Sequence, residues 1–268
     1  MTDAKTLVQA QFGANAAKYS TSAVHAKGAS LQRLVDLVQP KPAWSTLDVA
    51  TGAGHTALAF APHVKRSVAS DLTPEMLVET AKNAAARGFA NVETVAADAE
   101  HLPFGDATFD LVTCRIAPHH FPNIPAFVAE AARVLKPGGT LALVDNVTPD
   151  GETSPGFSAA QLEDAGVVYN AFEKIRDPSH GRAWSSTEWR AVVADAGFEI
   201  THVEHCPKVM DFETWCTTMA VAAPTVPKLA DMLDTASPAL QAFLTPTNAG
   251  GKRGFVLTEL ILIARKAM

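Results

Sequence analysis

Short apolar runs alternate with longer amphipathic segments in the middle of the chain, and this alternation predicts strands separated by helices. One helix is expected after Thr73, a capping residue followed by Pro74, and it should end before Gly88. A second helix is predicted at 123–135, where Lys136-Pro137-Gly138-Gly139 stops it. Strands joined through helices need crossover connections, so we expect a parallel sheet. The predicted strands are 46–50, 67–70, 92–96, 109–114 and 140–146.

The alternation is less regular after residue 146. Pro149-Asp150-Gly151 predicts a loop, and the capping-box spacing of Ser185-Ser186-Thr187-Glu188 predicts a helix that runs to about Ala196. Two further strands are expected at 198–206 and 254–266, with a helical, proline-rich stretch between them. Another helix is predicted where apolar residues recur on one helical face, at Leu162, Ala165, Tyr169, Phe172 and Ile175.

Composition narrows the class of protein. The 268 residues are 47% apolar and carry 22 Lys and Arg against 28 Asp and Glu, a net charge of -6. Because no segment is densely basic, nucleic acid or an anionic membrane is not expected as a partner, and no apolar run predicts a signal or a membrane insertion. Cys114, Cys206 and Cys216 are too widely spaced for a zinc site or a disulfide framework. We therefore expect a reduced, cytoplasmic, soluble protein without a metal.

A glycine-rich turn at 47–56 is the strongest local signal. It predicts a buried strand, then Gly52 and Gly54, then the start of a helix whose N–H groups can face a negative ligand. This arrangement is typical of nucleotide-like cofactor sites. The pattern also satisfies G-x-G-x-x-A and is followed by Asp71, so NAD(P) binding is an open alternative, as is a tight turn without a ligand.

Acidic residues at further strand ends separate these alternatives. These acids are Asp48, Asp71 and Asp98, and they lie in segments that follow one another in a typical order. Through these segments the chain resembles the class I S-adenosylmethionine-dependent methyltransferases. The segments are LDVATGAGHTALA, ASDLTPEML, VAADAEHLPFGDATFDLVTC and RVLKPGGTLALVD. The chain is most similar to the branch of ubiquinone and menaquinone biosynthesis C-methyltransferases, over residues 44–148. Phe12-x-x-x-Ala16-x-x-Tyr19 also resembles an entry motif of that branch. The sequence departs from the family pattern where Ala50 replaces the first glycine and Thr51 the common cysteine.

The resemblance implies a doubly wound α/β fold with a mostly parallel, seven-stranded, Rossmann-like sheet, a reversed C-terminal hairpin and helical lid insertions. It implies one methyltransferase domain over 1–268. The expected parts are an N-terminal helical lid at 1–45, a cofactor-binding core at 46–148, lid or substrate insertions at 149–182 and 207–250, and final strands at 198–206 and 254–266.

The same resemblance implies S-adenosyl-L-methionine as the cofactor. Asp48 would lie near its amino group, Asp71 would accept from both ribose hydroxyls, and Asp98 would accept from the adenine amine. Each of these acids has a structural alternative, because strand-end aspartates often cap helices or turns, and Asp48 could tie down its loop. The other implied cofactor-binding residues are Tyr19, Ala50, Gly52, Gly54, Leu72, Met76 and Ala99.

Candidate catalytic residues follow the strand at 109–114. His119 or His120 could take a proton from a hydroxyl, amine or activated carbon, and Arg115 could steady an enolate or phenolate. The alternatives are a histidine packed beneath the next helix and an arginine paired with a core acid. Asp145, at the end of its strand, and Trp184 are candidates for the substrate pocket.

The sequence therefore predicts a methyltransferase that acts by in-line displacement on a small, apolar or aromatic metabolite. One competing hypothesis is a single-domain NAD(P)-dependent oxidoreductase, although neither Tyr19 nor Tyr169 has a lysine four residues on. The other is a cofactor-binding protein without chemistry. Whether carbon, oxygen, nitrogen or sulfur is methylated stays open, as does assembly into a homodimer.

Overall fold

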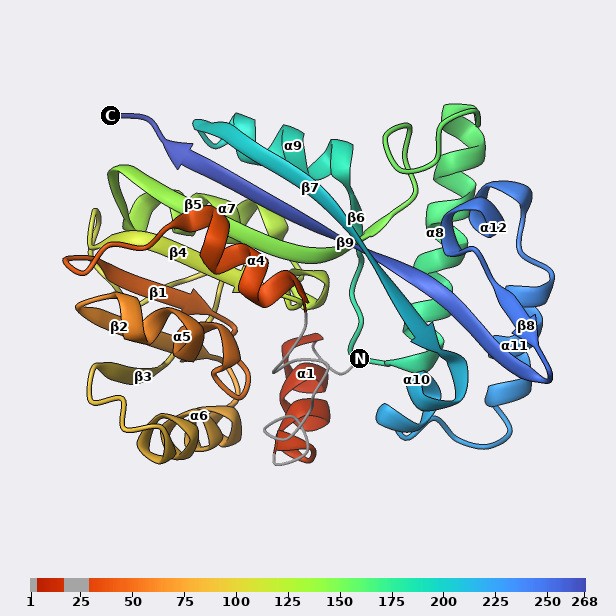
Figure 1. Cartoon of the computed structure of the whole chain (residues 1–268), viewed down its shortest axis with the longest axis horizontal. Coiled ribbons are helices and arrows are strands. Elements are labelled where there is room, and N and C mark those ends of the chain that lie inside the picture. The colour runs from red at the N-terminus through yellow and green to blue at the C-terminus, as the bar shows by residue number, and fades with distance from the viewer. Residues whose placement is uncertain (1–3, 17–28) are drawn as a thin grey trace. The chain divides into compact units, whose positions relative to one another are not determined.

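The computed structural model of the chain describes residues 4–16 and 29–268. Its central element is an α/β sheet in which parallel strands alternate with helices along the chain (Figure 1). Within the described residues, the main path of the sheet has the strand order β3-β2-β1-β4-β5-β9-β7, and the short strands β6 and β8 pair with β5 and β9. The pairs β1–β2, β2–β3, β1–β4 and β4–β5 are parallel. The predicted doubly wound, mostly parallel sheet is confirmed.

The strand bounds lie close to those expected from the sequence. Val92–Ala96 is β3 as predicted, and β1, β2, β4, β7 and β9 begin within two residues of the expected positions, whereas β5 begins five residues early and the short strands β6 and β8 were not predicted. The full set is β1 (Ser45–Val49), β2 (Arg66–Asp71), β3 (Val92–Ala96), β4 (Phe109–Arg115), β5 (Leu135–Thr148), β6 (Trp184–Ser185), β7 (Phe198–Asp211), β8 (Thr247–Ala249) and β9 (Lys252–Lys266).

Helix α7 ends at Val134, just before Lys136-Pro137-Gly138-Gly139 as predicted, but β5 begins at Leu135 and not at the expected residue 140. Leu135 already pairs with Phe109 of β4, and the register shifts before Leu111 pairs with Thr140. This irregularity leaves room for Pro137, which has no N–H, and for Gly138 with its positive φ of 72°. The pairing of β4 with β5 therefore begins at Leu135 and is interrupted before Thr140.

Helices flank the strands along the chain. The predicted helix after Thr73 is α6 (Pro74–Ala86), and the one at 123–135 is α7 (Ile124–Val134), capped by the Asn123 side chain. The remaining helices of the described chain are α1 (Ala4–Gly13), α4 (Ala29–Val38), α5 (His55–Phe60), α8 (Ala159–Arg176), α9 (Ser186–Asp195), α10 (Phe212–Thr218), α11 (Val226–Asp234) and α12 (Pro238–Leu244), with short 3-10 turns η1 (Ala61–His63) and η2 (Pro118–His120).

The chain forms two compact units. Unit 1 contains Met1–Asp145, Ala191–Glu204 and Ile261–Met268, and unit 2 contains Asn146–Arg190 and His205–Leu260. Strands β5, β7 and β9 each pass from one unit to the other. The single domain expected over 1–268 stays a prediction, but its two proposed insertions both fall within unit 2.

Unit 1 has its core on the strands β1, β2 and β4. Leu47, Val68, Leu111 and Val112 are fully buried, as expected for strands that helices cover on both faces. Burial of such side chains stabilises the fold by roughly 1.5–3 kcal/mol each relative to exposure. The rigid parallel strands bring their carboxyl ends to one edge, where the loops after β1, β2, β3 and β4 begin.

Unit 2 has an aromatic core. The ring of Phe172 stacks on that of Trp215 with centroids 4.6 Å apart, and Phe255 packs edge-on against Trp215 at 5.1 Å. Tyr169 packs edge-on against Phe243. Leu162 and Ala165 are buried on the same face of α8, which confirms the helical face predicted from the sequence. The structure thus accounts for these aromatic residues by packing.

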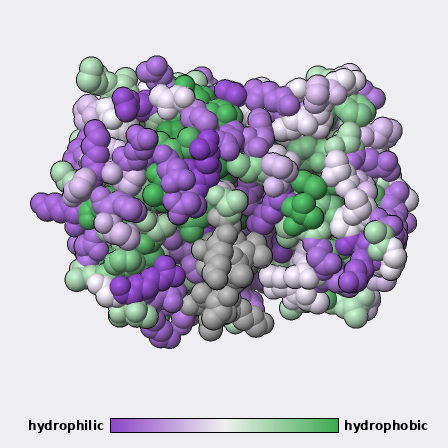
Figure 2. Space-filling view, in the orientation of Figure 1, coloured by the Kyte–Doolittle hydropathy of each residue, from purple (hydrophilic) through white to green (hydrophobic). Residues whose placement is uncertain are grey.

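On the face of the molecule in Figure 2, hydrophobic side chains are scattered among hydrophilic ones. The large exposed hydrophobic residues Val78, Val167 and Val209 lie on three different elements. Within residues 4–16 and 29–268, no helix has both the length and the apolar character needed to cross a membrane.

Candidate active site

The turn after β1 has the backbone geometry that its glycines predict. Gly52 and Gly54 have φ values of 56° and 87°, and a Cβ at residue 54 would lie 2.7 Å from Cγ2 of Thr80. Only glycine therefore fits at position 54. Ala50 also has a positive φ, 52°, at the place where the family often has glycine, and this conformation costs an L-residue roughly 1–2 kcal/mol.

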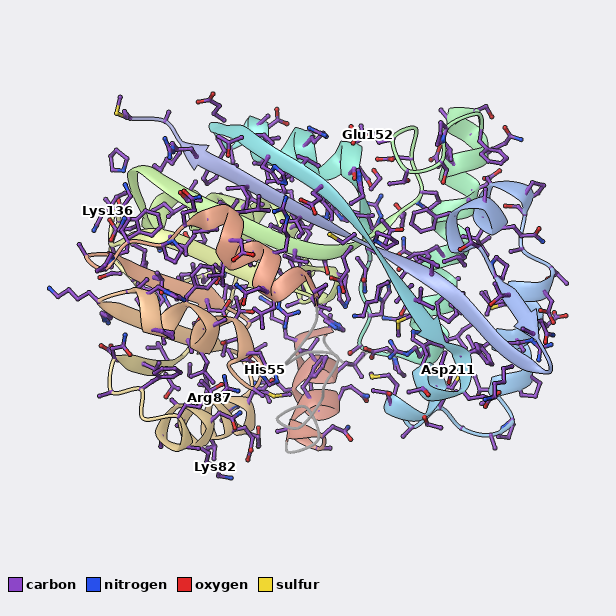
Figure 3. The ribbon with its side chains drawn as sticks, in the orientation of Figure 1. His55, Lys82, Arg87, Lys136, Glu152 and Asp211 are labelled. Carbon is purple, nitrogen blue, oxygen red and sulfur yellow. The ribbon has the colours of Figure 1, made fainter. Side chains whose placement is uncertain are left out.

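The turn is fixed to α6 by two side chains. The hydroxyl of Thr80 donates to the carbonyl of Gly52 at 2.8 Å, and the side-chain amide of Asn83 donates to the carbonyl of Ala53 at 3.0 Å. His55 begins α5 directly after the turn and is labelled in Figure 3. The polypeptide is thereby held in a tight loop whose backbone a ligand can approach.

Asp71 links the end of β2 to this turn. One carboxylate oxygen accepts the N–H of Gly52 and the other accepts the N–H of Thr73, both at 2.8 Å. Burial raises the pKa of Asp71, although the backbone hydrogen bonds oppose the rise. Each oxygen still has capacity for a further donor. The predicted contact of Asp71 with two ribose hydroxyls stays a prediction.

Asp48 is enclosed by its own loop and the neighbouring strand. Its carboxylate accepts from the hydroxyls of Thr51 at 2.6 Å and Thr113 at 2.7 Å, and from the N–H of Ala57 at 3.2 Å. Burial raises the pKa of Asp48 to about 6, while the two hydroxyls and the charge of Arg115 lower it. These bonds match the loop-tying alternative, and contact with a cofactor amino group stays a prediction.

The ends of β2 and β3 carry the residues predicted to surround adenine. Asp71 pairs in register with Ala96, so Leu72 and Asp98 follow neighbouring strand ends, with Ala99 next along the chain. Met76, on the following helix, is 2% exposed. This confirms that the strand ends are adjacent, as the motif spacing requires.

Helix α1 crosses these strand ends. Lys5 Nζ donates to Asp98 at 2.6 Å and to Glu100 at 2.7 Å, and the Gln9 amide donates to the carbonyl of Leu72 at 2.9 Å. Burial acts to raise the pKa of Asp98, but the ammonium of Lys5 and the N–H of Glu100 outweigh it and leave that pKa below its usual value. No local signal in the sequence indicates the role of Lys5.

The turn η2 brings together residues that the sequence assigned to separate roles. Nδ1 of His119 lies 2.6 Å from Oδ1 of Asp145, which follows the β5 residue paired with Arg115. His119 is 8% exposed and Asp145 is completely buried. The ring of His120 lies 4.2 Å from that of His119, and Phe12 of α1 packs edge-on against His120 at 5.0 Å.

The remaining candidates lie elsewhere. Nε of Arg115 donates to the hydroxyl of Thr56 at 3.1 Å, at the start of α5. Trp184 belongs to unit 2, where its ring packs against Trp189 and below the guanidinium of Arg182. Tyr19 lies outside the described residues. In the part of the chain that the structure describes, no group of three or more His, Cys, Asp or Glu side chains could hold a metal ion.

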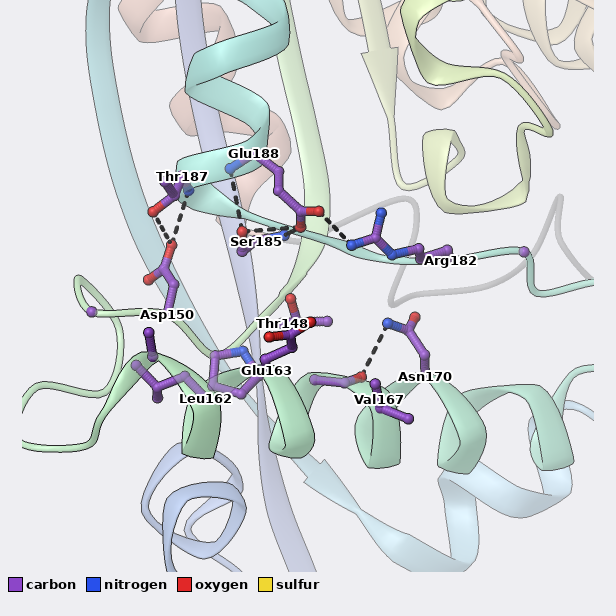
Figure 4. Close-up of a pocket in the computed structure, with 15 residues that line it drawn as sticks. Thr148, Asp150, Leu162, Glu163, Val167, Asn170, Arg182, Ser185, Thr187 and Glu188 are labelled. Atoms are coloured by element: carbon purple, nitrogen blue, oxygen red, sulfur yellow. Dashed lines mark hydrogen bonds and ion pairs between the residues drawn. The ribbon is translucent and has the colours of Figure 1, made fainter.

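Unit 2 contains a pocket of about 590 Å³ beside α8 (Figure 4). Asp150 lines it and accepts from the N–H and hydroxyl groups of both Thr153 and Thr187. Glu188 accepts from Ser185 and pairs with Arg182. These polar side chains are bonded to one another, so they fix the loops around the pocket.

Comparisons with known proteins agree with this geometry. The model of the methyltransferase domain family matches residues 47–143. The chain is 34% identical over 204 residues to YcgJ of Bacillus subtilis strain 168, described as an uncharacterized methyltransferase, with 76% of each chain covered. The solved structure of BH2331 from Bacillus halodurans C-125, described as a putative methyltransferase, has a TM-score of 0.82 at 39% identity, and the match covers 90% of this chain and all of that one.

A third relative comes from the branch that the motifs resemble. It is the ubiquinone/menaquinone biosynthesis C-methyltransferase UbiE of Brucella anthropi, 40% identical over 179 residues, which are 64% of this chain and 61% of that protein. The doubly wound fold, the aspartates at its strand ends and the similarity to these relatives together identify an enzyme that transfers methyl groups. The chain belongs to the class I S-adenosylmethionine-dependent methyltransferases.

Proposed function

We propose that the protein transfers a methyl group from S-adenosyl-L-methionine to a small, apolar or aromatic molecule. The observation that carries the proposal is the rim formed by the ends of β1, β2 and β3. There Asp71 bonds the glycine turn, and Asp98 lies after the neighbouring strand. Ligands of open α/β sheets bind at the carboxyl ends of the strands, and these ends carry buried acceptors suited to hydroxyl and amine donors.

The residues present fit this cofactor. A Cβ at Gly52 would meet nothing within 4 Å in the described part of the chain, so the turn leaves open space beside its backbone. Asp48 and Asp71 are carboxylates whose burial raises their pKa, which means that each would gain from a nearby cation or from further donors. Asp71 would hold the ribose, Asp98 the adenine amine, and Leu72 and Met76 the adenine ring.

The bound cofactor supplies a methyl group on a positively charged sulfur. Because that charge is lost during transfer, exclusion of water and alignment of the acceptor are the main tasks of the protein. Helix α1 supports this role, since Gln9 binds the carbonyl at the end of β2 and Phe12 packs on His120 after β4. The helix would shield the rim while methyl transfer takes place.

An aromatic acceptor is supported by the relative from Brucella anthropi, whose name assigns it to ubiquinone and menaquinone biosynthesis. The net charge of -6 disfavours nucleic acid as the acceptor. We also propose a cytoplasmic enzyme, because Cys114, Cys206 and Cys216 are all free thiols. Assembly into a homodimer stays a prediction.

Calorimetry with S-adenosylhomocysteine tests the proposal. We expect binding by the wild type, no binding by Asp71→Asn, and unchanged binding by Asp36→Asn, a matched change on α4. A response to NADPH without a response to S-adenosylhomocysteine would support the oxidoreductase instead. If the ligand binds but no acceptor in a labelled-methyl screen is modified, the non-catalytic alternative is favoured.

A further inference from the structure

We propose that the pocket of unit 2 binds a small organic cation, an alkyl- or arylalkylamine whose ammonium group meets Glu163 and Thr148. This site goes beyond the proposed methyl transfer and does not depend on it, because none of the described residues that line the pocket is a candidate cofactor-binding or catalytic residue. The pocket volume of about 590 Å³ suits a small molecule. Its wall consists of residues between 148 and 188, from β5, from α8 and from the start of α9 (Figure 4).

Several polar groups in the pocket wall already have partners within the protein. The side-chain amide of Asn170 donates to the carbonyls of Gly166 and Ala183, at 3.1 Å and 3.2 Å. The guanidinium of Arg182 is paired with Glu188, so these two charges neutralise each other. Polar contacts with a ligand are therefore left to the side chains in the wall that have no partner.

Thr148 supplies the first of these side chains. It is only 5% exposed, and its hydroxyl makes no hydrogen bond with any described residue. A Cβ at Gly166 would lie 3.6 Å from Oγ1 of Thr148, so the hydroxyl faces α8, and both residues line the pocket. Because Gly166 has no side chain, the hydroxyl stays uncovered. A buried hydroxyl without a partner is unfavourable, and an N–H donor in the pocket would satisfy its oxygen.

Two carboxylates give the pocket a negative charge. Burial acts to raise the pKa of Asp150, but hydrogen bonds from Thr187 and Thr153 lower it overall, so the carboxylate stays ionised. Glu163, on α8, makes no hydrogen bond within the described residues. In the part of the chain that the structure describes, no Lys, Arg or His side chain forms an ion pair with either carboxylate. The pocket therefore favours a positively charged ligand.

The same groups disfavour other classes of ligand. An anion would be repelled by Asp150 and Glu163, and it would have to break the pair of Arg182 with Glu188 to gain a counter-charge. A metal ion would find too few ligands, because no group of three or more His, Cys, Asp or Glu side chains among the described residues could hold one. An organic cation needs fewer protein ligands, because its other substituents are its own.

A primary amine also matches the apolar part of the wall. Val167 of α8 lines the pocket and is 66% exposed, and Leu162 lines it one turn earlier. A hydrocarbon chain on these side chains would remove apolar surface from water. The ammonium group has three N–H donors, so Glu163 and Thr148 can each accept one while water accepts the third. Asp150 would add the attraction of its charge without direct contact.

Methyl NMR spectra of the ¹³C-labelled full chain test the site with hexylamine, which is charged at neutral pH. Hexanol and hexanoate are the neutral and anionic counterparts, and the Val167 signals are assigned by their loss in Val167→Ala. We expect hexylamine to shift the Val167 signals in a saturable way at millimolar concentration, and the counterparts to bind at least a few-fold more weakly. Equal responses to the three compounds, or no response at Val167, would overturn the inference. The same shift with magnesium chloride alone would also overturn it, since the pocket would then hold an inorganic ion.

Substitutions in the wall test the two polar contacts separately. Glu163→Gln should weaken hexylamine binding by about 2–5-fold, because the side chain is exposed, and Asp164→Asn should hardly change it. Asp164 is the matched control, an exposed acid next along α8 that does not line the pocket. Equal affinities in these two variants would contradict the role of Glu163 and so the proposed site.

Thr148→Val removes the hydroxyl and keeps the shape of the side chain, so it should weaken hexylamine binding by about 2–10-fold. Thr148→Ser, which keeps the hydroxyl, should bind hexylamine nearly as well as the wild type. Unchanged methyl signals of unit 1 in each variant show that the fold is intact. Wild-type affinity in folded Thr148→Val would overturn the inference, and if that variant does not fold, the comparison of Glu163→Gln with Asp164→Asn decides.

Discussion

Asp48 in unit 1 and Asp150 in unit 2 are both buried aspartates that tie a loop to the start of a helix, yet their pKa values shift in opposite directions. Burial raises the pKa of Asp48 to about 6, despite its hydrogen bonds. Burial also acts to raise the pKa of Asp150, but the donors of Thr187 and Thr153 outweigh it and the net shift is downward. In unit 2, hydrogen bonds therefore outweigh the cost of burying the charged Asp150. In unit 1, the hydrogen bonds of Asp48 do not outweigh the cost of its burial.

This difference indicates where each unit can gain from a ligand. A carboxylate with enough donors is stabilised by the protein alone and serves the fold. One that is buried without enough donors gains free energy when a cation or hydroxyl arrives. By this criterion Asp48, at the strand ends of unit 1, would gain from a polar ligand. Asp150, beside the pocket of unit 2, already has enough hydrogen-bond donors from the protein.

The largest expected effect comes from removing a rim carboxylate. Asp71→Ala should weaken S-adenosylhomocysteine binding by at least about 100-fold, because hydrogen bonds to a charged group contribute roughly 1.5–3 kcal/mol each. Asp150→Ala, the corresponding change in unit 2, should lower the free energy of unfolding by about 2 kcal/mol or more and leave ligand affinity unchanged. Calorimetry and urea denaturation measure the two effects, and wild-type affinity in Asp71→Ala would contradict the site.

Two glycines sharpen the comparison further. Gly54 and Gly156 have φ values of 87° and 97°, but a Cβ at 54 meets Thr80 at 2.7 Å whereas one at 156 meets nothing within 4 Å among the described residues. Gly54→Ala should cost about 3 kcal/mol or more of unfolding free energy, from strain plus overlap. Gly156→Ala should cost about 1 kcal/mol from strain alone. Equal losses in urea denaturation would show that the turn in unit 1 is not tightly packed.

The opposite pKa shifts predict opposite pH dependences. Because the folded pKa of Asp48 is about 6 against an ordinary 3.8, its contribution to stability is full below pH 3.8 and is lost as pH rises through 6. Asp48→Asn should therefore gain up to about 3 kcal/mol relative to the wild type between pH 4 and 7.

The folded pKa of Asp150 is lowered, so its contribution is present above pH 3.8 and is lost as pH falls further. The free energy of unfolding that Asp150→Asn loses relative to the wild type should therefore decrease only when the pH falls below 3.8. Urea denaturation from pH 3 to pH 7 measures both differences. Parallel pH profiles for the two variants would refute the contrast between the carboxylates.

The smallest effect is expected at Lys5, whose ion pair with Asp98 is partly exposed. Such pairs contribute about 1 kcal/mol or less, so Lys5→Ala should hardly change stability. Since Lys5 Nζ would compete for Asp98 with the adenine amine of the proposed cofactor, the variant should bind S-adenosylhomocysteine a few-fold more tightly at low salt, and the gain should vanish at high salt. Lys82→Ala, which removes the Lys82–Glu79 pair on α6, is the control. Weaker binding by Lys5→Ala would mean that the lysine assists the ligand.

The sequence predicts best what local patterns determine. The strands β1, β2 and β4 are short, mostly buried runs, and the glycine turn depends on residues adjacent in the chain, so both were predictable. The helix stop at Lys136–Gly139 was predicted correctly, but the early start of β5 at Leu135 was not, because it depends on pairing with Phe109 of β4. Thr113, a polar residue between the apolar Val112 and Cys114, is a signal that could have indicated a buried partner.

The side-chain pairs at the site were not predictable, because sheet register and helix placement create them. His119 and Asp145 are 26 residues apart, and Lys5 and Asp98 are 93 apart. The sequence identified three of these four residues as candidates, but no spacing rule connects them. Only the register of β4 against β5 and the position of α1 place each residue beside its partner.

The chain passes between the two units four times, and this limits how the protein can be divided into fragments. The polypeptide changes unit after Asp145, Arg190, Glu204 and Leu260, and three of these changes fall inside continuous strands. A fragment ending at residue 145 would lack the β7 and β9 segments of its own sheet. Exchanging unit 2 between relatives would therefore require two simultaneous replacements, with three junctions inside strands and one inside α9, and removing one terminus cannot isolate either unit.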